Sequence, residues 1–278
     1  MLKTFLKSLL VLALLIAFPH VPPAAGEADP EVQQIVAAIK EKLSRGQVLT
    51  AADFKDEFAS LEKLSAARRK AGAGEAAGPI FLIGQVYDEI RDPVQAVAVY
   101  ERVMQDFPAS KFAEYAKGNV EILRPAAEMQ KARAKLVAGV AFPDFKKRDL
   151  DGRPMSVSGL KGKVVLVDFW ATFCPPCMAA MPELKRLHAK YQGQGFEILG
   201  INEDYTPEAL PRAVDRLGLT WPQYHDADDE LARRYGARLL PEVYLLDREG
   251  RVVARDEELK GDELEKAVRQ ALGLKNEN

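Results

Sequence analysis

The sequence predicts an α/β domain preceded by an all-α domain. Apolar residues recur at helical spacing between residues 31 and 64, as amphipathic helices require. Further on, the β-branched run over 163–169 has the composition of a buried parallel strand. Apolar residues at helical spacing follow that run up to Tyr191, so we expect a strand that passes directly into a helix.

The first residues have the organisation of a signal peptide. Lys3 and Lys7 precede an apolar run over 9–18, and small residues follow up to Gly26. We therefore expect 1–26 to be a cleaved signal peptide and the protein to be periplasmic or secreted, where disulfides persist. The apolar run is shorter than the roughly 18 residues of a spanning helix. The alternative is that the leader is retained and anchors the protein to the inner membrane.

The charge balance argues against some partners. The 278 residues carry 39 basic and 41 acidic side chains, a formal net charge of −2. Loss of 1–26 removes two lysines and no acid, so the formal charge becomes −4. We expect a mildly acidic protein with no nucleic-acid partner, and we interpret the basic clusters at 68–70 and 146–148 as solvated surface.

The first half of the mature chain, 27–138, is predicted to be helical. Helices are expected over 31–44, from a cap at Thr50 through 64, over 79–90, from a cap at Asp92 to Phe107, and over 125–137. The Gly- and Ala-rich stretch 71–78 is predicted to be a loop between them.

One helix pair carries a repeat signature. Its motif residues are Ile83, Gly84, Tyr87, Ala96, Tyr100 and Pro108. At this spacing the pair resembles one tetratricopeptide repeat of about 34 residues. The resemblance implies a groove for a partner that the sequence does not identify, and a plain helical bundle is the alternative.

The chemistry is predicted to lie at Cys174 and Cys177, the only two cysteines. Thiols three residues apart at the start of a helix are close enough to form a disulfide. Unpaired N–H groups and the helix dipole should lower the pKa of Cys174 and make it the nucleophile. Cys177, one turn further in, should be more buried and resolve the intermediate. Pro175 suits the first helical position, and together with Pro176 it restricts the loop.

Two other uses of these cysteines are open. A zinc site needs about four ligands, and His188 and His225 are the only histidines outside the leader. A structural disulfide across so small a loop adds little stability. Redox chemistry is therefore favoured.

Several segments of the second half, 139–278, match those of a known family. They are 142–145, 149–152 and 160–163 in an opening hairpin, 168–177 around the cysteines, Pro182, the strand 196–201, the approach 235–241 and the strand and turn 244–250. From residue 141 on, the chain resembles the TlpA/ResA-type thiol-disulfide oxidoreductases of the thioredoxin superfamily. The resemblance implies a thioredoxin-like domain with a helix-rich insertion over about 202–234.

The resemblance also implies roles for other residues. Pro241 would be a cis-proline that shapes the docking surface beside the sulfurs, the alternative being an ordinary trans turn. Asp168 lies in an apolar strand, so burial should raise its pKa. The family role places it beneath Cys177, where it moves a proton; the alternative is a solvated or hydrogen-bonded carboxylate at a strand edge. Trp170 is expected to pack under the motif.

Some positions depart from the family pattern. Ala180 stands where many relatives have a glutamate, which makes Asp168 the better candidate acid. Glu242 follows the expected cis-proline and would repel acidic partners, perturb Cys174 or face water. His188 is expected on the outer face of its helix, and Glu203 and Asp204 as solvated acids.

The resemblance implies a protein-disulfide oxidoreductase that needs no cofactor and acts on disulfide- or dithiol-bearing client proteins. A reductant role, such as supplying thiols for cytochrome c assembly, would require a membrane thiol electron donor. The direction of electron flow is not fixed. One rival is a thiol peroxidase, but the spacing of Thr172 from Cys174 does not match a peroxidatic site. A helical-repeat adaptor with secondary redox activity is the other rival.

Overall fold

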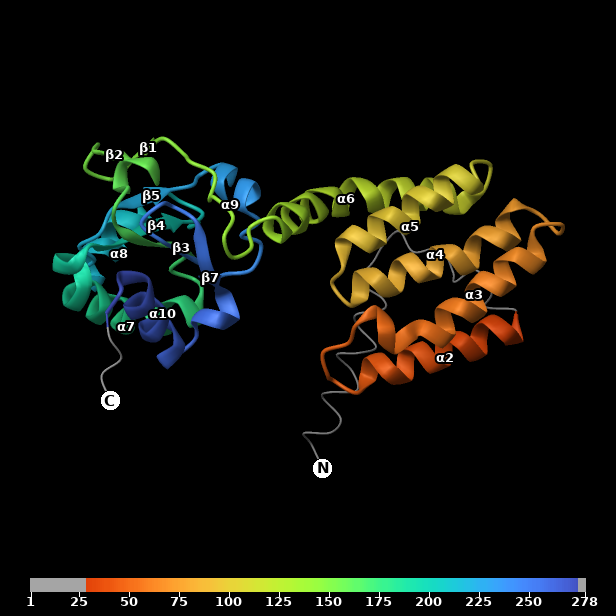
Figure 1. Cartoon of the computed structure of the whole chain (residues 1–278). Coiled ribbons are helices and arrows are strands. Elements are labelled where there is room, and N and C mark those ends of the chain that lie inside the picture. Colours follow the sequence, from red (N-terminus) through yellow and green to blue (C-terminus); the bar gives the residue numbers. More distant parts are fainter. Residues whose placement is uncertain (1–28, 275–278) are drawn as a thin grey trace, which may run out of the picture. The chain divides into compact units, whose positions relative to one another are not determined.

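The computed structural model describes residues 29–274, so the predicted signal peptide lies outside the described residues. The chain forms two compact units that divide between Ala127 and Glu128, inside helix α6 (Lys111–Ala134). Figure 1 shows helices alone in the first unit and a sheet flanked by helices in the second. Of the helices in residues 29–274, none combines the length and apolar character needed to cross a bilayer.

Helices of the first unit begin at capping side chains, of which the one at Asp92 was predicted. The elements of this unit are α2 (Pro30–Ser44), η1 (Ala51–Phe54), α3 (Lys55–Arg68), α4 (Ala73–Glu89), α5 (Pro93–Asp106) and the first part of α6. The Asp29 side chain accepts from the N–H groups of Glu31 and Val32 at the start of α2. Asp92 caps α5 in the same way, with Pro93 at the first position, where no N–H donor is needed.

Two boundaries in this unit were predicted incorrectly. The stretch 71–78 is not a loop, because α4 starts at Ala73 and contains Pro79 in its interior. The expected helix over 125–137 is the end of the single helix α6, which contains Pro125. In α4 the small side chains are buried in the core, so packing outweighs the weak helix propensity of Gly and the break expected at Pro.

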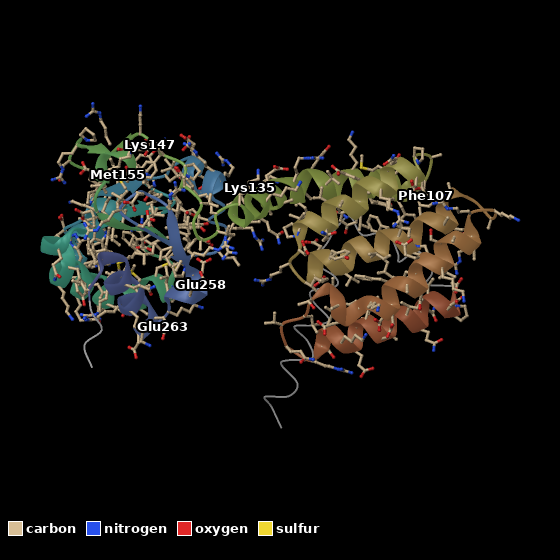
Figure 2. All side chains as sticks on the ribbon, in the orientation of Figure 1. Phe107, Lys135, Lys147, Met155, Glu258 and Glu263 are labelled. Atoms are coloured by element: carbon tan, nitrogen blue, oxygen red, sulfur yellow. A yellow bond between two sulfur atoms is a disulfide. The ribbon has the colours of Figure 1, made fainter. Side chains whose placement is uncertain are left out.

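Close approach of α4 and α5 depends on Gly84. A Cβ at this position would lie 2.6 Å from a ring atom of Tyr100, which is 1 % exposed. The Tyr100 ring also packs on Phe81, with the ring centroids 5.1 Å apart. Figure 2 shows the spaces between these helices filled by side chains. Gly84 therefore allows the aromatic ring to lie against the backbone of the neighbouring helix.

Replacing Gly84 by alanine is expected to lower the free energy of unfolding by about 1–3 kcal/mol, because the added methyl overpacks this contact. The penalty should outweigh the advantage of about 1 kcal/mol that alanine has in a helix. Gly118→Ala in α6 is the matched control, since a Cβ there meets nothing within 4 Å. That variant should be stabilised by up to about 1 kcal/mol. Urea unfolding followed by circular dichroism measures both, and equal effects would contradict the packing argument.

The second unit has a mixed five-stranded sheet. Its elements are β1 (Lys147–Arg148), β2 (Pro154–Met155), η2 (Ser158–Leu160), β3 (Val164–Trp170), α7 (Pro175–Tyr191), η3 (Gln192–Gln194), β4 (Phe196–Asn202), α8 (Ala209–Leu217), β5 (Gln223–His225), α9 (Glu230–Tyr235), β6 (Glu242–Leu246), β7 (Val252–Arg255), η4 (Asp256–Leu259) and α10 (Asp262–Leu272). The strand order is β5-β4-β3-β6-β7. Strands β3, β4 and β5 run parallel, whereas β6 is antiparallel to β3 and β7 to β6.

The central strand β3 is buried along its whole length and divides two cores. Val165, Val167 and Phe169 face the core that contains residues of α9 and of the opening hairpin. Leu166 and Trp170 face the other core, which contains residues of α7, α8 and α10. Successive side chains of a strand point to opposite faces, so Asp168 is directed to the α7 side.

The expected fold class is confirmed, with an all-α region followed by a thioredoxin-like α/β domain. The segment 202–234 does contain helices, α8 and α9, as expected. It also contains the edge strand β5, which the sequence analysis did not identify because the strand is only three residues long.

Candidate functional site

The two cysteines lie where β3 gives way to α7. Cys174 is the N-cap of that helix, and it forms a disulfide with Cys177 whose sulfurs are 2.02 Å apart. The N–H of Cys177 donates to the Sγ of Cys174 at 3.2 Å. Cys174 is 6 % exposed and Cys177 is 1 % exposed, so the order of burial is as expected. The first sulfur is thus the one that an approaching group reaches.

The start of α7 favours a negatively charged sulfur at its N-cap. Pro175 and Pro176 occupy the first two helical positions and are exposed. The N–H groups of a helix N-terminus have no partner within the helix, and their dipoles favour negative charge at the N-cap. Within residues 29–274, no group of three or more His, Cys, Asp and Glu side chains is arranged to hold a metal ion.

Asp168 is a buried carboxyl group on the face of the sheet that packs against α7. The residue is 2 % exposed, and its Oδ2 has no hydrogen-bond partner among residues 29–274. Burial raises the pKa of Asp168 to about 7. This placement in the central strand excludes the alternative of a solvated carboxylate at a strand edge. A carboxyl group with this pKa can accept and release a proton near neutral pH.

Trp170 packs in the core beneath the cysteines, as expected, with no exposed surface. Its indole Nε1 donates to the Oε1 of Gln223 at 3.0 Å. The Gln223 side chain crosses β4 at Gly200, where a Cβ would lie 2.1 Å from Oε1. Only glycine leaves room for this bond, and the sequence analysis missed it. The glycine inside a strand was the available signal.

The peptide bond between Leu240 and Pro241 is cis, as expected. Glu242, the next residue, does not face water: it is 4 % exposed and accepts from the Nε of Arg133 at 2.7 Å. Burial, reinforced by Asp256, raises the pKa of Glu242 to about 7 against the opposing effect of Arg133. Arg133 also forms an ion pair with Asp256, so one guanidinium group contacts two acids, Glu242 and Asp256.

The acids after β4 are not solvated, contrary to expectation. Asp204 is 5 % exposed, and its Oδ1 accepts from the backbone N–H and the hydroxyl of Thr172 at 2.8 and 2.7 Å. Asn202 donates to the other oxygen of Asp204 at 3.0 Å. This network fixes the backbone two residues before Cys174. From the sequence alone, two acids that follow a strand are expected to be solvated. The segment around Thr172, which contacts Asp204, is 32 residues away along the chain.

Glu203 is a third acid near this strand end, and it is partly buried. Its backbone N–H donates to the carbonyl of Trp170 at 2.9 Å. Burial, with smaller contributions from Asp226, Asp229 and Glu242, raises the pKa of Glu203 to about 8. The Oε1 of Glu203 has no partner among the described residues. At neutral pH the carboxyl ends of β3 and β4 therefore carry less negative charge than the residue types imply.

His188 was also placed incorrectly by the sequence analysis. It is 4 % exposed rather than on the outer face of α7. Its Nε2 lies 2.8 Å from Glu197, and its Nδ1 lies 3.2 Å from the hydroxyl of Thr220. Position 188 is four residues after Leu184, on the buried stripe of the helix, which was the signal for its burial.

Phe173, the residue before Cys174, forms an exposed aromatic pair with Tyr205. The rings of Phe173 and Tyr205 stack with their centroids 4.7 Å apart and their planes at 7°. Phe173 is 49 % exposed and Tyr205 is 87 % exposed. Large exposed apolar surfaces of this kind are typical of sites that contact other molecules.

Comparison with known proteins agrees with this geometry. The Redoxin family model matches residues 137–272. The thiol-disulfide oxidoreductase ResA of Bacillus thuringiensis (strain Al Hakam) is 36 % identical over 121 residues, which cover 44 % of this chain and 70 % of that protein. ResA of Geobacillus thermodenitrificans is 36 % identical over 120 residues, 43 % of this chain and 69 % of that protein.

A solved structure is also similar. The thioredoxin domain of a thiol-disulfide oxidoreductase from Bacteroides vulgatus shares 32 % sequence identity, with a TM-score of 0.46, and covers 49 % of this chain and 99 % of that domain. The relatives and the disulfide at the helix start lead to one conclusion. The chain belongs to the TlpA/ResA-like thiol-disulfide oxidoreductases of the thioredoxin superfamily and is a protein-disulfide oxidoreductase.

Proposed function

We propose that this protein works outside the cytoplasm and uses the Cys174-Pro175-Pro176-Cys177 pair to reduce disulfides of client proteins. The observation that carries the proposal is the disulfide at the start of α7, in which Cys174 is the more exposed sulfur and accepts the N–H of Cys177. Such an arrangement favours a thiolate at position 174 when the pair is reduced.

The proposed reaction has two exchange steps. The Cys174 thiolate attacks one sulfur of a client disulfide, which forms a mixed disulfide and releases the other client sulfur as a thiolate. The Cys177 thiol then loses its proton and attacks Cys174, which restores the 174–177 disulfide and releases the second client thiolate. Two electrons pass from the dithiol to the client, so a dithiol donor must reduce the protein again.

Asp168 is the proposed proton acceptor for Cys177 in the second step. Its pKa of about 7 supports this assignment, as does its place on the α7 side of β3. Trp170 supports the motif from below through its bond to Gln223. Pro241, which lacks an N–H, is proposed to shape the surface on which the client segment docks.

The location and the donor are part of the same proposal. A cleaved leader over 1–26 would deliver a helical domain over 27–138 and a redox domain over 139–278 to the periplasm or the exterior, where a membrane thiol protein would supply electrons. The mass of the exported protein tests the leader, since a retained anchor would leave the full-length mass in the membrane fraction. Helices of the first unit would serve a partner that remains unidentified.

A trapping experiment tests the client reaction. Cys177→Ser leaves the attacking sulfur and removes the resolving one, so mixed disulfides with clients should accumulate several-fold over wild type. Non-reducing electrophoresis followed by mass spectrometry identifies them, with Cys174→Ser as the control that traps nothing. If reduced wild-type protein instead turned over peroxide and passed no electrons to any disulfide, the peroxidase alternative would replace the proposal.

A further inference from the structure

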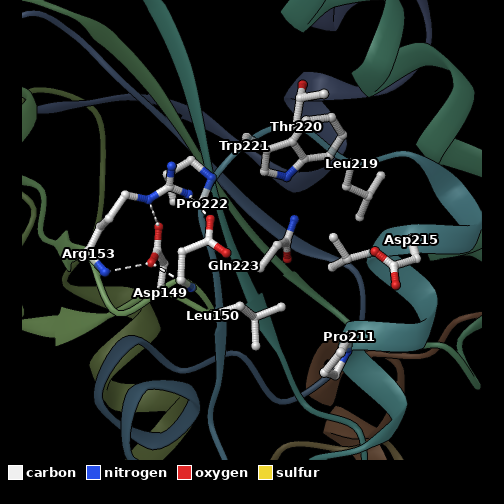
Figure 3. Close-up of a pocket in the computed structure, with 12 residues that line it drawn as sticks. Asp149, Leu150, Arg153, Pro211, Asp215, Leu219, Thr220, Trp221, Pro222 and Gln223 are labelled. Carbon is white, nitrogen blue, oxygen red and sulfur yellow. Dashed lines mark hydrogen bonds and ion pairs between the residues drawn. The ribbon is translucent and has the colours of Figure 1, made fainter.

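Two features of the second unit are not used by the reaction proposed above. One is a cavity of about 470 Å³ at the β5 edge of the sheet, where Asp149 and Arg153 form an ion pair with each other (Figure 3). Charges that are already paired do not require a ligand in the cavity. The other feature is a set of contacts that Arg133, in the last turn of α6, makes with residues on both sides of Pro241.

Arg133 touches both ends of the segment 236–242, in which the proposed docking surface lies. At one end, its Nε donates to the Oε1 of Glu242 at 2.7 Å. At the other end, Gly236 lies against the helix. A Cβ at that position would be 2.6 Å from the Cβ of Arg133 and 2.7 Å from its backbone nitrogen. Between these two contacts Leu239 is 57 % exposed. One residue of α6 therefore fixes the start and the end of an exposed loop.

The end of α6 is itself bonded to the strands beside this loop. The carbonyl oxygen of Arg133 accepts from the Nη1 of Arg255 at 2.6 Å. Its guanidinium group forms an ion pair with Asp256, whose Oδ1 accepts from the backbone N–H of Val243 at 3.3 Å. Bonds to its backbone and to its side chain thus join Arg133 to the start of β6 and to the end of β7.

The charges in this cluster make Arg133 difficult to replace. The side chain of Glu242 is 5 % exposed and that of Asp256 is 13 % exposed. Burial and the charge of Asp256 disfavour the ionised form of Glu242, and the guanidinium group of Arg133 opposes them. Removal of one partner of a buried ion pair leaves the other charge uncompensated, which is costly. Without Arg133, Glu242 must take up a proton or move toward water, and a movement of Glu242 displaces its neighbour Pro241.

We propose that Arg133 is a positioning residue for the thiol reaction and holds the segment 237–241 in the place where a client chain docks. The inference rests on the proposed function, because it gives Arg133 a part in the same client reaction. Arg133 acts through Glu242 and through the backbone, not on the sulfurs themselves. The Redoxin family model matches residues 137–272, so Arg133 lies outside it. The redox site therefore depends on a residue of the helix that precedes the matched domain.

The test compares two disulfides of different size as substrates of the full-length, reduced protein. Insulin is a polypeptide that must dock beside Cys174, whereas hydroxyethyl disulfide is neutral and too small to need the loop. Arg133→Gln should lower the second-order rate constant with insulin about tenfold, because the docking surface is misplaced, and that with hydroxyethyl disulfide less than about twofold. Acid quenching at timed intervals, followed by alkylation of the remaining thiols and electrophoresis, measures both rate constants.

Two further variants control for charge and for folding. Arg133→Lys keeps a positive charge but loses the planar group that reaches two acids, so the rate constant with insulin should fall about threefold. Lys131→Gln is the matched control, because Lys131 is exposed on the same helix and forms its ion pair with Glu128. Both of its rate constants should equal those of wild type. Circular dichroism shows whether each variant is folded, and if Arg133→Gln is not, Arg133→Lys decides by the same comparison.

A double variant identifies the residue through which Arg133 acts. Adding Glu242→Gln to Arg133→Gln removes the uncompensated charge, so the rate constant with insulin should return to within about threefold of wild type. No recovery would overturn the inference, because Glu242 would not be the link. Equal losses with both disulfides, or no loss with either, would overturn it as well, since positioning of a client requires a difference between them. Wild-type protein that reduced neither disulfide would instead contradict the proposed function.

Discussion

Replacing Cys174 by serine is expected to lower the rate of insulin reduction by more than about a thousandfold. A hydroxyl is a far weaker nucleophile than a thiolate, and the N–H groups at the start of α7 cannot ionise it at neutral pH. The one cysteine that remains, Cys177, is only 1 % exposed and so is poorly placed to take over the attack. The measurement is the rate at which insulin precipitates in the presence of dithiothreitol, compared with dithiothreitol alone.

Cys177→Ser is the matched control for this experiment. Either variant loses the same disulfide and therefore the same loop constraint, about 2 kcal/mol in the chain-entropy account. Stability then cannot explain a difference between them. Only the Cys177 variant should react once with a disulfide and remain bound to it. If the two variants formed mixed disulfides equally well, the assignment of Cys174 as nucleophile would be wrong.

Features of the site that depend on a short stretch of sequence were predictable. The spacing of Cys174 and Cys177 and the strand before them fixed their place at the start of a helix. Asp168 stood out as a charge inside an apolar strand, and its burial follows from the burial of that strand. The cis bond before Pro241 followed from the family resemblance and not from any local pattern.

Features that depend on distant partners were not predictable. Asp204 is buried because it caps Thr172, and Gln223 because Gly200 lets it reach Trp170. The partners in these contacts are 32 and 53 residues apart. Periodicity within one element carries no information about such pairs. From residue type alone, Asp204 and Gln223 are expected to be solvated, and only the strand register shows that they are buried.

Boundaries in the helical region were missed for a related reason. The Gly- and Ala-rich segment before Pro79 has the local composition of a loop, yet Ala76, Ala77 and Ile80 are fully buried. Packing of these small residues against neighbouring helices stabilises α4 where propensity alone would not. Local patterns therefore placed the middle of each element better than its ends.

Asp168→Asn is expected to raise the stability of the oxidised protein at pH 8 by up to about 4 kcal/mol. The pKa of Asp168 is about 7 in the folded state because of burial, against an ordinary value of 3.8. Folding therefore disfavours the charged form, so wild type loses stability as pH rises from 3.8 to 7 and has lost the full amount above 7. Asparagine cannot ionise, so its advantage should vanish at pH 4. Urea unfolding of both proteins at the two pH values measures it.

The control is Glu197→Gln, for which the sign is reversed. Burial raises the pKa of Glu197, but hydrogen bonds from His188 and Lys163 outweigh it and leave the pKa below its ordinary value. This carboxylate therefore stabilises the folded state above the unfolded pKa, and its amide variant should be less stable at pH 8. A gain for Asp168→Asn that did not depend on pH would mean that folding does not change the pKa of this carboxyl group.

Asp168→Asn should slow catalysis although it stabilises the oxidised protein. Without a proton acceptor, Cys177 attacks the mixed disulfide more slowly, and a loss of about a hundredfold in that step is expected at neutral pH. The initial attack by Cys174 should be nearly unchanged, so the mixed disulfide should accumulate in stopped-flow mixing with a client. Rates that rise with pH toward wild type would identify the missing group as a base. A buried charge that costs stability is retained, on this account, because the resolving step requires it.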